Sequence, residues 1–534
     1  MRKKLYVVTT LLVLLCQINM SGQGYKNPII PGFYPDPSIC RVGDDYYLVN
    51  SSFEYFPGVP VFHSKDLVNW KQIGHCLTRE SQLPLKEVTP SMGIYAPTLR
   101  YHEGVFYMVT TLMISRDKNV NFYVTATDPA GPWSDPIHVD QSGIDPSLFW
   151  DEDGKVYFQS NRATSFDDPR AIYQSEIDIK TGKLLSETRM LWTGSGAQYI
   201  EASHVYKKDG YYYLMTAEGG TFYNHQVTIA RSKNIWGPFE GCPHNPILTS
   251  RNSYNVIQAT GHGDLIQAHD GSWWMVFLCI RPTVGNCPVL GRETALAPVE
   301  WKNGWPVVNQ TGVATAEMNV KTLPLKPFPC QNTSTEFDEE QLGLEWNYIR
   351  NPINSNYSLS KKRGTLALKG TQWTLDDASG SVTFIGRRIQ HWYFSAETEL
   401  EFSAKASNEH AGICIMSRND YHYDLYLEKR DKHNFLVLKY RMGSINHIEA
   451  EIPVKGTSIR LKIEGKKTFY EFCYAEEGSS DFQIIAAVDS KFMSADVGGG
   501  YTGPYIGLFA SGNGKDSKAY AYYNWFKYQI KDEY

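Results

Sequence analysis

Short apolar and aromatic runs, separated by turns, dominate the first 320 residues of this 534-residue chain. Typical runs are residues 45–49, 155–158 and 211–215, and each follows a turn that contains Gly and Asp. No long stretch repeats its apolar positions every 3.6 residues, as an amphipathic helix would. The pattern therefore predicts a chain built from short strands.

The strand-like phrases recur as a repeat. Its units begin at Asp36, Pro97, Asp145, Glu201 and His262, and each beginning is followed by a similar phrase. Units of roughly 40 to 50 residues with about four strands are typical of propeller blades. The five units therefore predict a five-bladed β-propeller over residues 25–320.

Beyond residue 320 the repeat disappears. Residues 321–335 contain several prolines and are predicted to be a linker. Segments of strand length that alternate or run apolar then follow at 365–369, 397–402, 458–463 and 505–509. We predict that residues 336–534 form a β-sandwich, so that the whole chain is all-β.

Composition narrows the function classes. Aromatic residues make up 13% of the chain, which suits a β-rich core and also the stacking of sugar rings. The net charge is −5, and the sequence lacks the basic patch that a nucleic-acid partner requires. A neutral substrate is compatible with this composition.

The N-terminus predicts export. Residues 2–4 are basic, residues 5–15 are apolar, and Ser21 and Gly22 offer a cleavage region, so residues 1–22 are predicted to be a signal peptide. The apolar run is too short to span a bilayer. A lipid anchor on Cys16 is the alternative, although Cys16 follows Leu15 and not a small residue. The mature chain is expected to be periplasmic or extracellular, without a membrane span.

Eight of the nine cysteines would remain after that cleavage. Their spacing fits no metal site, and they are too sparse for a disulfide scaffold. A Cys279–Cys287 bridge is one alternative. Unpaired buried thiols are the favoured prediction.

Three of the five units open on a carboxylate, namely Asp36, Asp145 and Glu201. Equivalent positions in a repeat become equivalent positions in space, so around a propeller axis the three groups would face one another. Hydrolysis of a glycosidic bond needs a protonated carboxyl group for the leaving oxygen and an ionised one that activates water or attacks. A third carboxylate can raise the pKa of the acid by repulsion. The set therefore predicts an acid–base site.

Simpler explanations compete with this hypothesis. Asp before Pro is a common turn element, whereas Glu201 lies among apolar neighbours, where an unpaired carboxylate would be costly. His262 opens the fifth unit and is either a structural residue or a site residue that binds water or a cation. Arg292 either binds sugar hydroxyls and balances the acidic site, or pairs with Glu293 at the surface.

The combined motifs resemble glycoside hydrolase family 43, on the branch of β-xylosidases and α-L-arabinofuranosidases with a C-terminal, concanavalin-like β-sandwich. The resemblance covers nearly the whole mature chain. The matching phrases are Asn-Pro-Ile at 27–29, Gly-Phe-Tyr-Pro-Asp-Pro-Ser at 32–38, Ser-Phe-Glu-Tyr-Phe-Pro-Gly-Val-Pro at 52–60, Asp-Pro-Ser at 145–147, Ala-Glu-Gly-Gly-Thr at 217–221, Tyr-Asn-His at 223–225, Gly-His-Gly at 261–263, Gly-Arg-Glu-Thr at 291–294, and Phe-Asp at 337–338 with Trp346.

The resemblance implies an inverting glycosidase that requires no cofactor. Asp36 would be the general base, Asp145 would modulate the pKa of the acid and orient it, and Glu201 would be the general acid. The residues expected to line the pocket for the terminal sugar are Phe53, Tyr95, Thr221, His262 and Arg292. The family often holds a calcium ion or a water in the axial channel beside the position of His262, and both stay open here. Its sandwich can also lend a loop to the pocket rim, which the sequence does not locate.

Two departures from the family pattern lie near the sugar. Glu201-Ala202-Ser203 stands where many β-xylosidases of this branch have Glu-Gly-Pro, and Tyr95 stands where many have Trp. An α-L-arabinofuranosidase therefore stays open beside the favoured β-D-xylosidase, with an oligosaccharide of plant hemicellulose as the expected substrate.

Two further alternatives belong to other classes. A non-catalytic sugar-binding propeller is one, although a binding site gains little from an acid with a raised pKa. The other is a retaining, fructosidase-like propeller. It would begin Trp-x-Asn-Asp-Pro, where this chain has Tyr34-Pro35-Asp36-Pro37.

Overall fold

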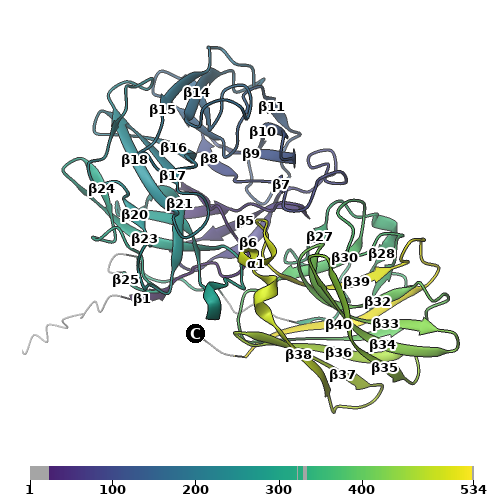
Figure 1. The fold of residues 1–534 in the computed structure, drawn as a ribbon. Helices are drawn as coiled ribbons and strands as arrows, with labels where there is room; N and C mark the ends of the chain where they lie inside the picture. Colours follow the sequence, from purple (N-terminus) through teal and green to yellow (C-terminus); the bar gives the residue numbers. More distant parts are fainter. Residues whose placement is uncertain (1–22, 321–322, 329–333, 532–534) are drawn as a thin grey trace, which may run out of the picture.

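A computed structural model describes residues 23–320, 323–328 and 334–531 of the chain. Almost all regular structure in it is β (Figure 1). The short helical segments of the described residues are η1 (Val284–Asn286), η2 (Asn354–Asn356), η3 (Ser490–Met493) and α1 (Ala495–Gly498). The strands form two bodies, one purple to teal and one green to yellow in Figure 1, and the predicted all-β class is confirmed.

The first body consists of five antiparallel sheets that follow one another along the described chain. The first sheet contains β2 (Ser38–Val42), β3 (Asp45–Val49), β5 (Gly58–Ser64) and β6 (Lys71–Leu77). The second contains β7 (Gly93–Ile94), β8 (Thr98–His102), β9 (Val105–Ser115), β10 (Lys118–Ala126) and β11 (Ile137–Val139). The third contains β12 (Ser147–Trp150), β13 (Val156–Ser160), β14 (Ile172–Ile177) and β15 (Arg189–Trp192).

The last two sheets complete this body. The fourth contains β16 (Glu201–Lys208), β17 (Tyr211–Glu218), β18 (Gln226–Ser232), β19 (Glu240–Gly241) and β20 (Leu248–Thr249). The fifth contains β21 (Gln258–Gln267), β22 (Trp273–Ile280), β23 (Glu293–Lys302) and β24 (Trp305–Val308). A separate pair, β1 (Gln23–Lys26) with β25 (Glu317–Val320), joins the start of the described chain to the end of the body.

The five sheets surround an axis. Strand β2 contacts β8 and β21, β12 contacts β8 and β16, and β16 contacts β21, so the five contacts close a ring. These inner strands begin at or just after the predicted unit starts, except that β21 begins at Gln258, four residues before His262. The aromatic runs that follow lie in β3, β13 and β17, where Tyr46, Tyr157 and Tyr213 are buried between sheets. The repeat in the sequence thus becomes a propeller.

The second body is a sandwich of two antiparallel sheets. The order in the larger sheet is β28 (Tyr357–Ser358), β29 (Leu366–Lys369), β40 (Tyr520–Ile530), β31 (Phe394–Phe402), β36 (Ser458–Gly465), β37 (Phe469–Glu476) and β38 (Gln483–Asp489), with β26 (Ser334–Thr335) beside β40. The order in the smaller sheet is β30 (Thr383–Arg388), β39 (Tyr505–Ser511), β32 (His410–Arg418), β33 (Tyr421–Arg430), β34 (His433–Met442) and β35 (Ile445–Val454). In β36 buried and partly exposed positions alternate, as a strand with one face on a core requires.

The two bodies share an interface. Strands β4 (Tyr55–Phe56) of the propeller and β27 (Tyr348–Ile349) of the sandwich pair with each other. The rings of Tyr55 and Tyr505 stack with centroids 3.8 Å apart. Asn351 accepts a hydrogen bond from the Leu85 amide and donates one to the Leu83 carbonyl. The sandwich therefore packs directly against the propeller.

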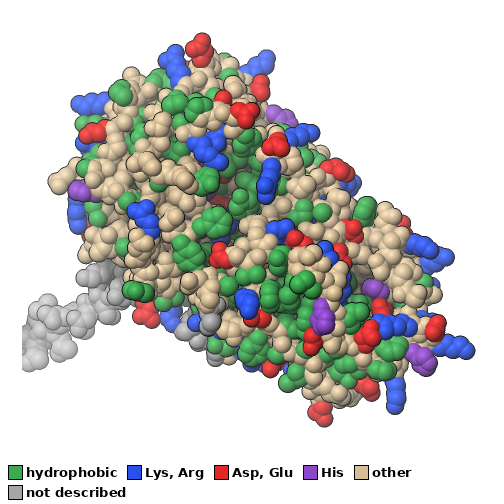
Figure 2. Space-filling view, viewed as in Figure 1, with side chains coloured by type: hydrophobic (Ala, Val, Ile, Leu, Met, Phe, Trp, Pro, Cys, Tyr) green, Lys and Arg blue, Asp and Glu red, His purple; other side chains and the backbone are tan. Residues whose placement is uncertain are grey.

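Several predictions from the sequence concern residues outside the described part. They are the signal peptide at 1–22, a lipid on Cys16, and the linker at 321–322 and 329–333, which contains Cys330. The other mature cysteines are free and buried, which confirms unpaired thiols and contradicts a Cys279–Cys287 bridge. No helix among the described residues is long and apolar enough to cross a membrane. On the face shown in Figure 2, basic and acidic side chains of the described residues are interspersed.

Candidate active site

One pocket on the propeller axis contains every residue that the sequence suggested for the site. Its lining residues are Asp36, Phe53, Tyr95, Ala96, Ile144, Asp145, Glu201, Thr221, His225, His262, Arg292 and Tyr501. The three carboxylates therefore converge although they lie far apart along the chain. Ala96, Ile144, His225 and Tyr501 belong to the pocket but not to the predicted set.

The inner strands deliver the carboxyl groups. Asp36 and Asp145 lie just before β2 and β12, and Glu201 is the first residue of β16. Asp36, Asp145 and His262 have φ of 55°, 53° and 49°, in the left-handed region that residues with a β-carbon seldom occupy. Such backbone strain is concentrated at functional sites, where the surrounding structure enforces it. Here the three strained residues all line the one axial pocket.

Asp36 is held as a carboxylate. The Ser51 hydroxyl donates to its Oδ2 over 2.5 Å and Arg292 Nη1 donates to its Oδ1 over 3.0 Å. His262 Nδ1 lies 3.8 Å from the same Oδ1. Burial opposes the charge, but Arg292, His262 and Ser51 outweigh burial and lower the pKa of Asp36. Asp36 is therefore ionised at neutral pH.

Arg292 connects three parts of the pocket. Besides Asp36, its Nη1 donates to Thr221 Oγ1 over 3.1 Å, and its Nη2 donates to the Tyr501 carbonyl over 3.0 Å. The alternative of a surface pair with Glu293 is wrong, because the Glu293 side chain is buried and accepts two hydrogen bonds from Arg281, 2.7 and 2.8 Å long.

Asp145 and Glu201 have the opposite electrostatic character from Asp36. Burial, with repulsion from Glu201 and Asp36, raises the pKa of Asp145 well above its ordinary range. Burial likewise raises the pKa of Glu201 to about 7, although the charge of Arg170 opposes the rise. The two groups therefore retain a proton between them at neutral pH.

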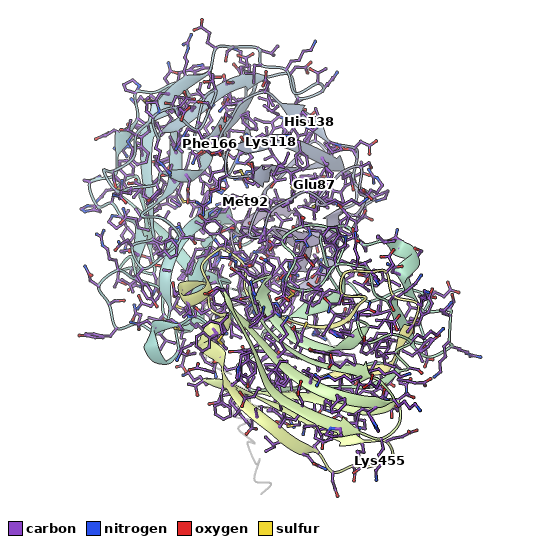
Figure 3. All side chains as sticks on the ribbon, turned by 45° about the vertical axis from the view of Figure 1, so that its right-hand side comes forward. Glu87, Met92, Lys118, His138, Phe166 and Lys455 are labelled. Atoms are coloured by element: carbon purple, nitrogen blue, oxygen red, sulfur yellow. The ribbon has the colours of Figure 1, made fainter. Side chains whose placement is uncertain are left out.

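Aromatic rings form one wall of the pocket. The ring centroid of Phe53 lies 5.2 Å from that of Tyr95 and 6.2 Å from that of Tyr501. The Tyr95 hydroxyl contacts the thioether of Met92, a residue labelled on the propeller in Figure 3. Tyr501 belongs to the sandwich and follows α1, so it is the rim residue that the sequence did not locate. Nothing in the propeller repeat could have indicated it.

His225 is the other polar lining residue that the sequence reasoning missed as a site residue. It lies just before β18, and the repeat units begin at the inner strands, so the repeat does not mark its position. Its Nδ1 lies 3.0 Å from the Ala259 carbonyl, which fixes the proton on Nδ1. Burial lowers its pKa to about 3, so the ring is neutral. The Tyr-Asn-His phrase at 223–225 was the available signal.

A buried ionic cluster fills the axial channel behind the pocket. Asp264 of β21 accepts hydrogen bonds from Ser38 of β2 and Tyr206 of β16, both 2.6 Å long. Arg100 of β8 donates to Asp264 over 2.8 Å and approaches His204 Nδ1 to 2.8 Å. These residues come from four of the five inner strands, so the cluster also connects the sheets.

The surroundings of His262 bear on the calcium ion or water that the family resemblance left open. Calcium takes six to eight oxygen ligands, which can be carboxylates, carbonyls or waters. The two carboxylates nearest His262 are Asp36 and Asp264, and each is already neutralised by a guanidinium, from Arg292 and Arg100 respectively. Among the described residues no group of three or more His, Cys, Asp or Glu side chains is placed to hold a metal.

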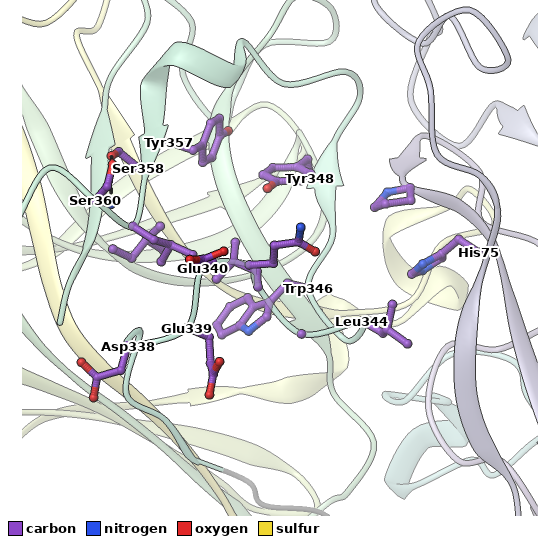
Figure 4. Close-up of a pocket in the computed structure, with 16 residues that line it drawn as sticks. His75, Asp338, Glu339, Glu340, Leu344, Trp346, Tyr348, Tyr357, Ser358 and Ser360 are labelled. Carbon is purple, nitrogen blue, oxygen red and sulfur yellow. Dashed lines mark hydrogen bonds between the residues drawn. The ribbon is translucent and has the colours of Figure 1, made fainter. Parts of the chain in front are cut away.

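A larger cavity of about 720 Å³ lies between the propeller and the sandwich (Figure 4). Its carboxylates, Asp338, Glu339 and Glu340, are consecutive exposed residues of one segment. Burial lowers the pKa of its histidine, His75, to about 3. No buried pair of an acid and a base therefore faces this cavity, and the axial pocket is the better candidate.

An acid–base site on the axis of a β-propeller is thus the class that the fold and the pocket define. A sequence model described as "Glycosyl hydrolases family 43" matches residues 25–306, and "Beta xylosidase C-terminal Concanavalin A-like domain" matches residues 334–529.

Relatives in both sequence and structure agree with these matches. A non-reducing end alpha-L-arabinofuranosidase, BoGH43B of Bacteroides ovatus, is 42% identical over 97% of each chain. A beta-xylosidase of Bacillus subtilis is 35% identical over 90% of this chain and 95% of the relative. The solved structure of a xylan beta-1,4-xylosidase from Bacillus halodurans has a TM-score of 0.90 at 35% identity, and covers 95% of this chain and 100% of its own. The chain belongs to glycoside hydrolase family 43 and is a glycosidase.

Proposed function

We propose that the protein is an exo-acting, inverting glycoside hydrolase that releases terminal xylose, arabinose or both from oligosaccharides of plant hemicellulose, with β-D-xylosidase activity favoured. The observation that carries this proposal is the contrast within one pocket. Asp36 has a lowered pKa, whereas Glu201 and Asp145 have raised ones. Carboxyl groups whose environments separate their pKa values are the signature of a general acid and a general base.

The proposed mechanism assigns one task to each group. Ionised Asp36 takes a proton from a water molecule as the water oxygen attacks the anomeric carbon. Protonated Glu201 gives its proton to the glycosidic oxygen as that bond breaks, and the attack from the opposite face inverts the configuration. Asp145 keeps the proton on the pair by repulsion and orients Glu201.

The shape of the pocket supports attack at a chain end. Its volume is about 90 Å³, and Tyr501 of the sandwich lies against Phe53 at its rim. So small a pocket suits one terminal sugar. Thr221, His225, His262 and Arg292 supply polar groups for its hydroxyls, and Phe53 and Tyr95 supply apolar surface.

α-L-Arabinofuranosidase activity is the second candidate. It is favoured by the 42% identical relative of that name and by Tyr95, which stands where many xylosidases of the branch have Trp. A terminal xylopyranoside and an arabinofuranoside present similar hydroxyl positions, so one pocket can serve both. The basic and apolar residues at 2–15 support export of the enzyme, which N-terminal sequencing of the secreted chain would test.

A panel of aryl glycosides tests the proposal. Aryl β-D-xyloside, aryl α-L-arabinofuranoside or both should be hydrolysed, and NMR should show the inverted anomer first. Glu201→Gln should lower kcat/KM about 10²- to 10⁴-fold without abolishing sugar binding. Retention of configuration would contradict the mechanism. Sugar binding by the wild type without turnover would favour the non-catalytic alternative.

A further inference from the structure

A second cavity lies beside the segment that leads into Glu201. Its volume is about 390 Å³, and its lining residues are Arg170, Thr193, Ala197, Gln198, Tyr199 and Ile200. Ile200 directly precedes Glu201, which lines the sugar pocket. Arg170 is the nearby charge that most strongly opposes the raised pKa of Glu201, so its guanidinium also lies close to the acid.

An aromatic ring and a cation are held together at this cavity. The guanidinium carbon of Arg170 lies 4.5 Å from the ring centroid of Tyr199, in a cation–π contact. Gly220 packs against the same ring, because a β-carbon at this position would lie 3.3 Å from the ring of Tyr199. Gly220 precedes Thr221 of the sugar pocket, so the ring of Tyr199 lies at the border between the two cavities.

The polar groups of the cavity are free to bind a ligand. Among the described residues, no hydrogen-bond or ion-pair partner is found for the side chains of Arg170, Thr193, Gln198 or Tyr199. The Tyr199 side chain is 44% exposed, so its ring is accessible to a ligand. Several free donors beside an exposed aromatic ring form a surface suited to a hydroxylated ring.

The position beside Glu201 decides which ring this would be. In the proposed reaction the acid donates its proton to the oxygen of the leaving group, so the leaving group must emerge beside Glu201. We propose that Arg170 and Tyr199, with Gln198 and Thr193, form the subsite that binds the sugar residue on the leaving side of the scissile bond. This inference rests on the proposed function. It predicts that the enzyme is adapted to oligosaccharides and not only to terminal sugars with small substituents.

The test compares two substrates that share the terminal sugar. β-1,4-Xylobiose places a sugar in the proposed subsite, whereas β-D-xylopyranosyl fluoride places only its covalently bound fluorine atom there, which leaves as fluoride when the C–F bond breaks. Tyr199→Ala and Arg170→Ala should each lower kcat/KM for xylobiose roughly tenfold, as the loss of one such contact does. The value for the fluoride should stay within about twofold.

Two matched controls are present in the propeller. Arg189 also lies over an aromatic ring, at 5.3 Å from that of Trp236, and Tyr254 is a fully exposed tyrosine. Neither residue lines the cavity, so Arg189→Ala and Tyr254→Ala should leave both substrates unaffected. Unchanged thermal unfolding of all four variants would show that they fold.

The remaining outcomes are distinguishable. The charge of Arg170 also lowers the pKa of Glu201. The pH profile of Arg170→Ala on xylobiose is therefore compared with that of the wild type. A displaced alkaline limb, with no effect of Tyr199→Ala, would overturn the subsite and assign Arg170 to the acid. An equal loss on both substrates, or no loss on either, would overturn it too. A wild type that hydrolyses neither substrate, nor any aryl glycoside, would overturn the proposed function itself.

Discussion

At the scale of single residues, the environment of each carboxyl group determines what it can do. Asp36 receives two short hydrogen bonds, one of them from a guanidinium, and its charge is thereby stabilised. Glu201 and Asp145 are buried close to each other and to that charge, which favours their protonated forms. One pocket thus holds a stabilised carboxylate beside two carboxyl groups that favour protonation.

The first prediction follows from these directions. The proposed acid Glu201 is protonated below its raised pKa of about 7, so kcat/KM should fall as the pH rises through about 7. The base Asp36 has a lowered pKa, so activity should persist on the acid side until the pH falls below the ordinary range of an aspartate. Initial rates on an aryl glycoside across pH 3 to 9 measure both limbs. Activity that rises through pH 7 would contradict the assignment.

Residues differ in how far the sequence could predict them. Asp36, Asp145, Glu201 and His262 hold equivalent positions in a repeat, so periodicity alone places them on one axis. Phe53, Tyr95 and Thr221 occupy no such position and were expected from the family resemblance, which also favoured one of the two roles open to Arg292. Tyr501 lies in the other body, and a contact between distant segments leaves no local pattern in the sequence.

At the scale of elements, the inner strands carry both the site and its support. The second unit begins at Pro97 and contributes no carboxylate, but its strand β8 supplies Arg100 to the axial channel. The family resemblance suggested calcium or water in this region. The sequence could not show that the guanidinium of Arg100 pairs with Asp264. The two residues lie 164 positions apart along the chain and meet only when the propeller closes.

The second prediction concerns Gly261 in β21. A β-carbon there would lie 2.3 Å from the ring of His225, far inside van der Waals contact, so Gly261→Ala must displace that ring from the pocket wall. We expect a loss of about 1–3 kcal/mol in the free energy of unfolding and a fall in kcat/KM. Gly241→Ala in β19 is the control, since its β-carbon would meet nothing closer than 3.7 Å. Equal behaviour of the two variants in denaturant titration and rate assays would refute this account.

At the scale of the whole molecule, the sandwich completes a pocket that the propeller alone leaves open. The Tyr501 amide donates to the Ser91 hydroxyl over 3.3 Å, and its carbonyl accepts from Arg292, the partner of Asp36. The Ser91 amide in turn donates to the buried carboxyl group of Glu54. Figure 1 shows the yellow α1, just before this segment, at the boundary between the two bodies. The sandwich therefore takes part in the site and is more than an appended module.

The last prediction separates the ring of Tyr501 from its backbone. Tyr501→Ala keeps the carbonyl that accepts from Arg292 but removes the ring that lies against Phe53 and Tyr95. Because the ring contributes contact with the sugar and not chemistry, KM for an aryl glycoside should rise roughly tenfold while kcat changes less. The side chain is 37% exposed, so the melting temperature should change little, as for the exposed control Tyr254→Ala. A fall in kcat with an unchanged KM would instead mean that the ring positions Arg292 and the base, and that the two bodies communicate through the reaction step.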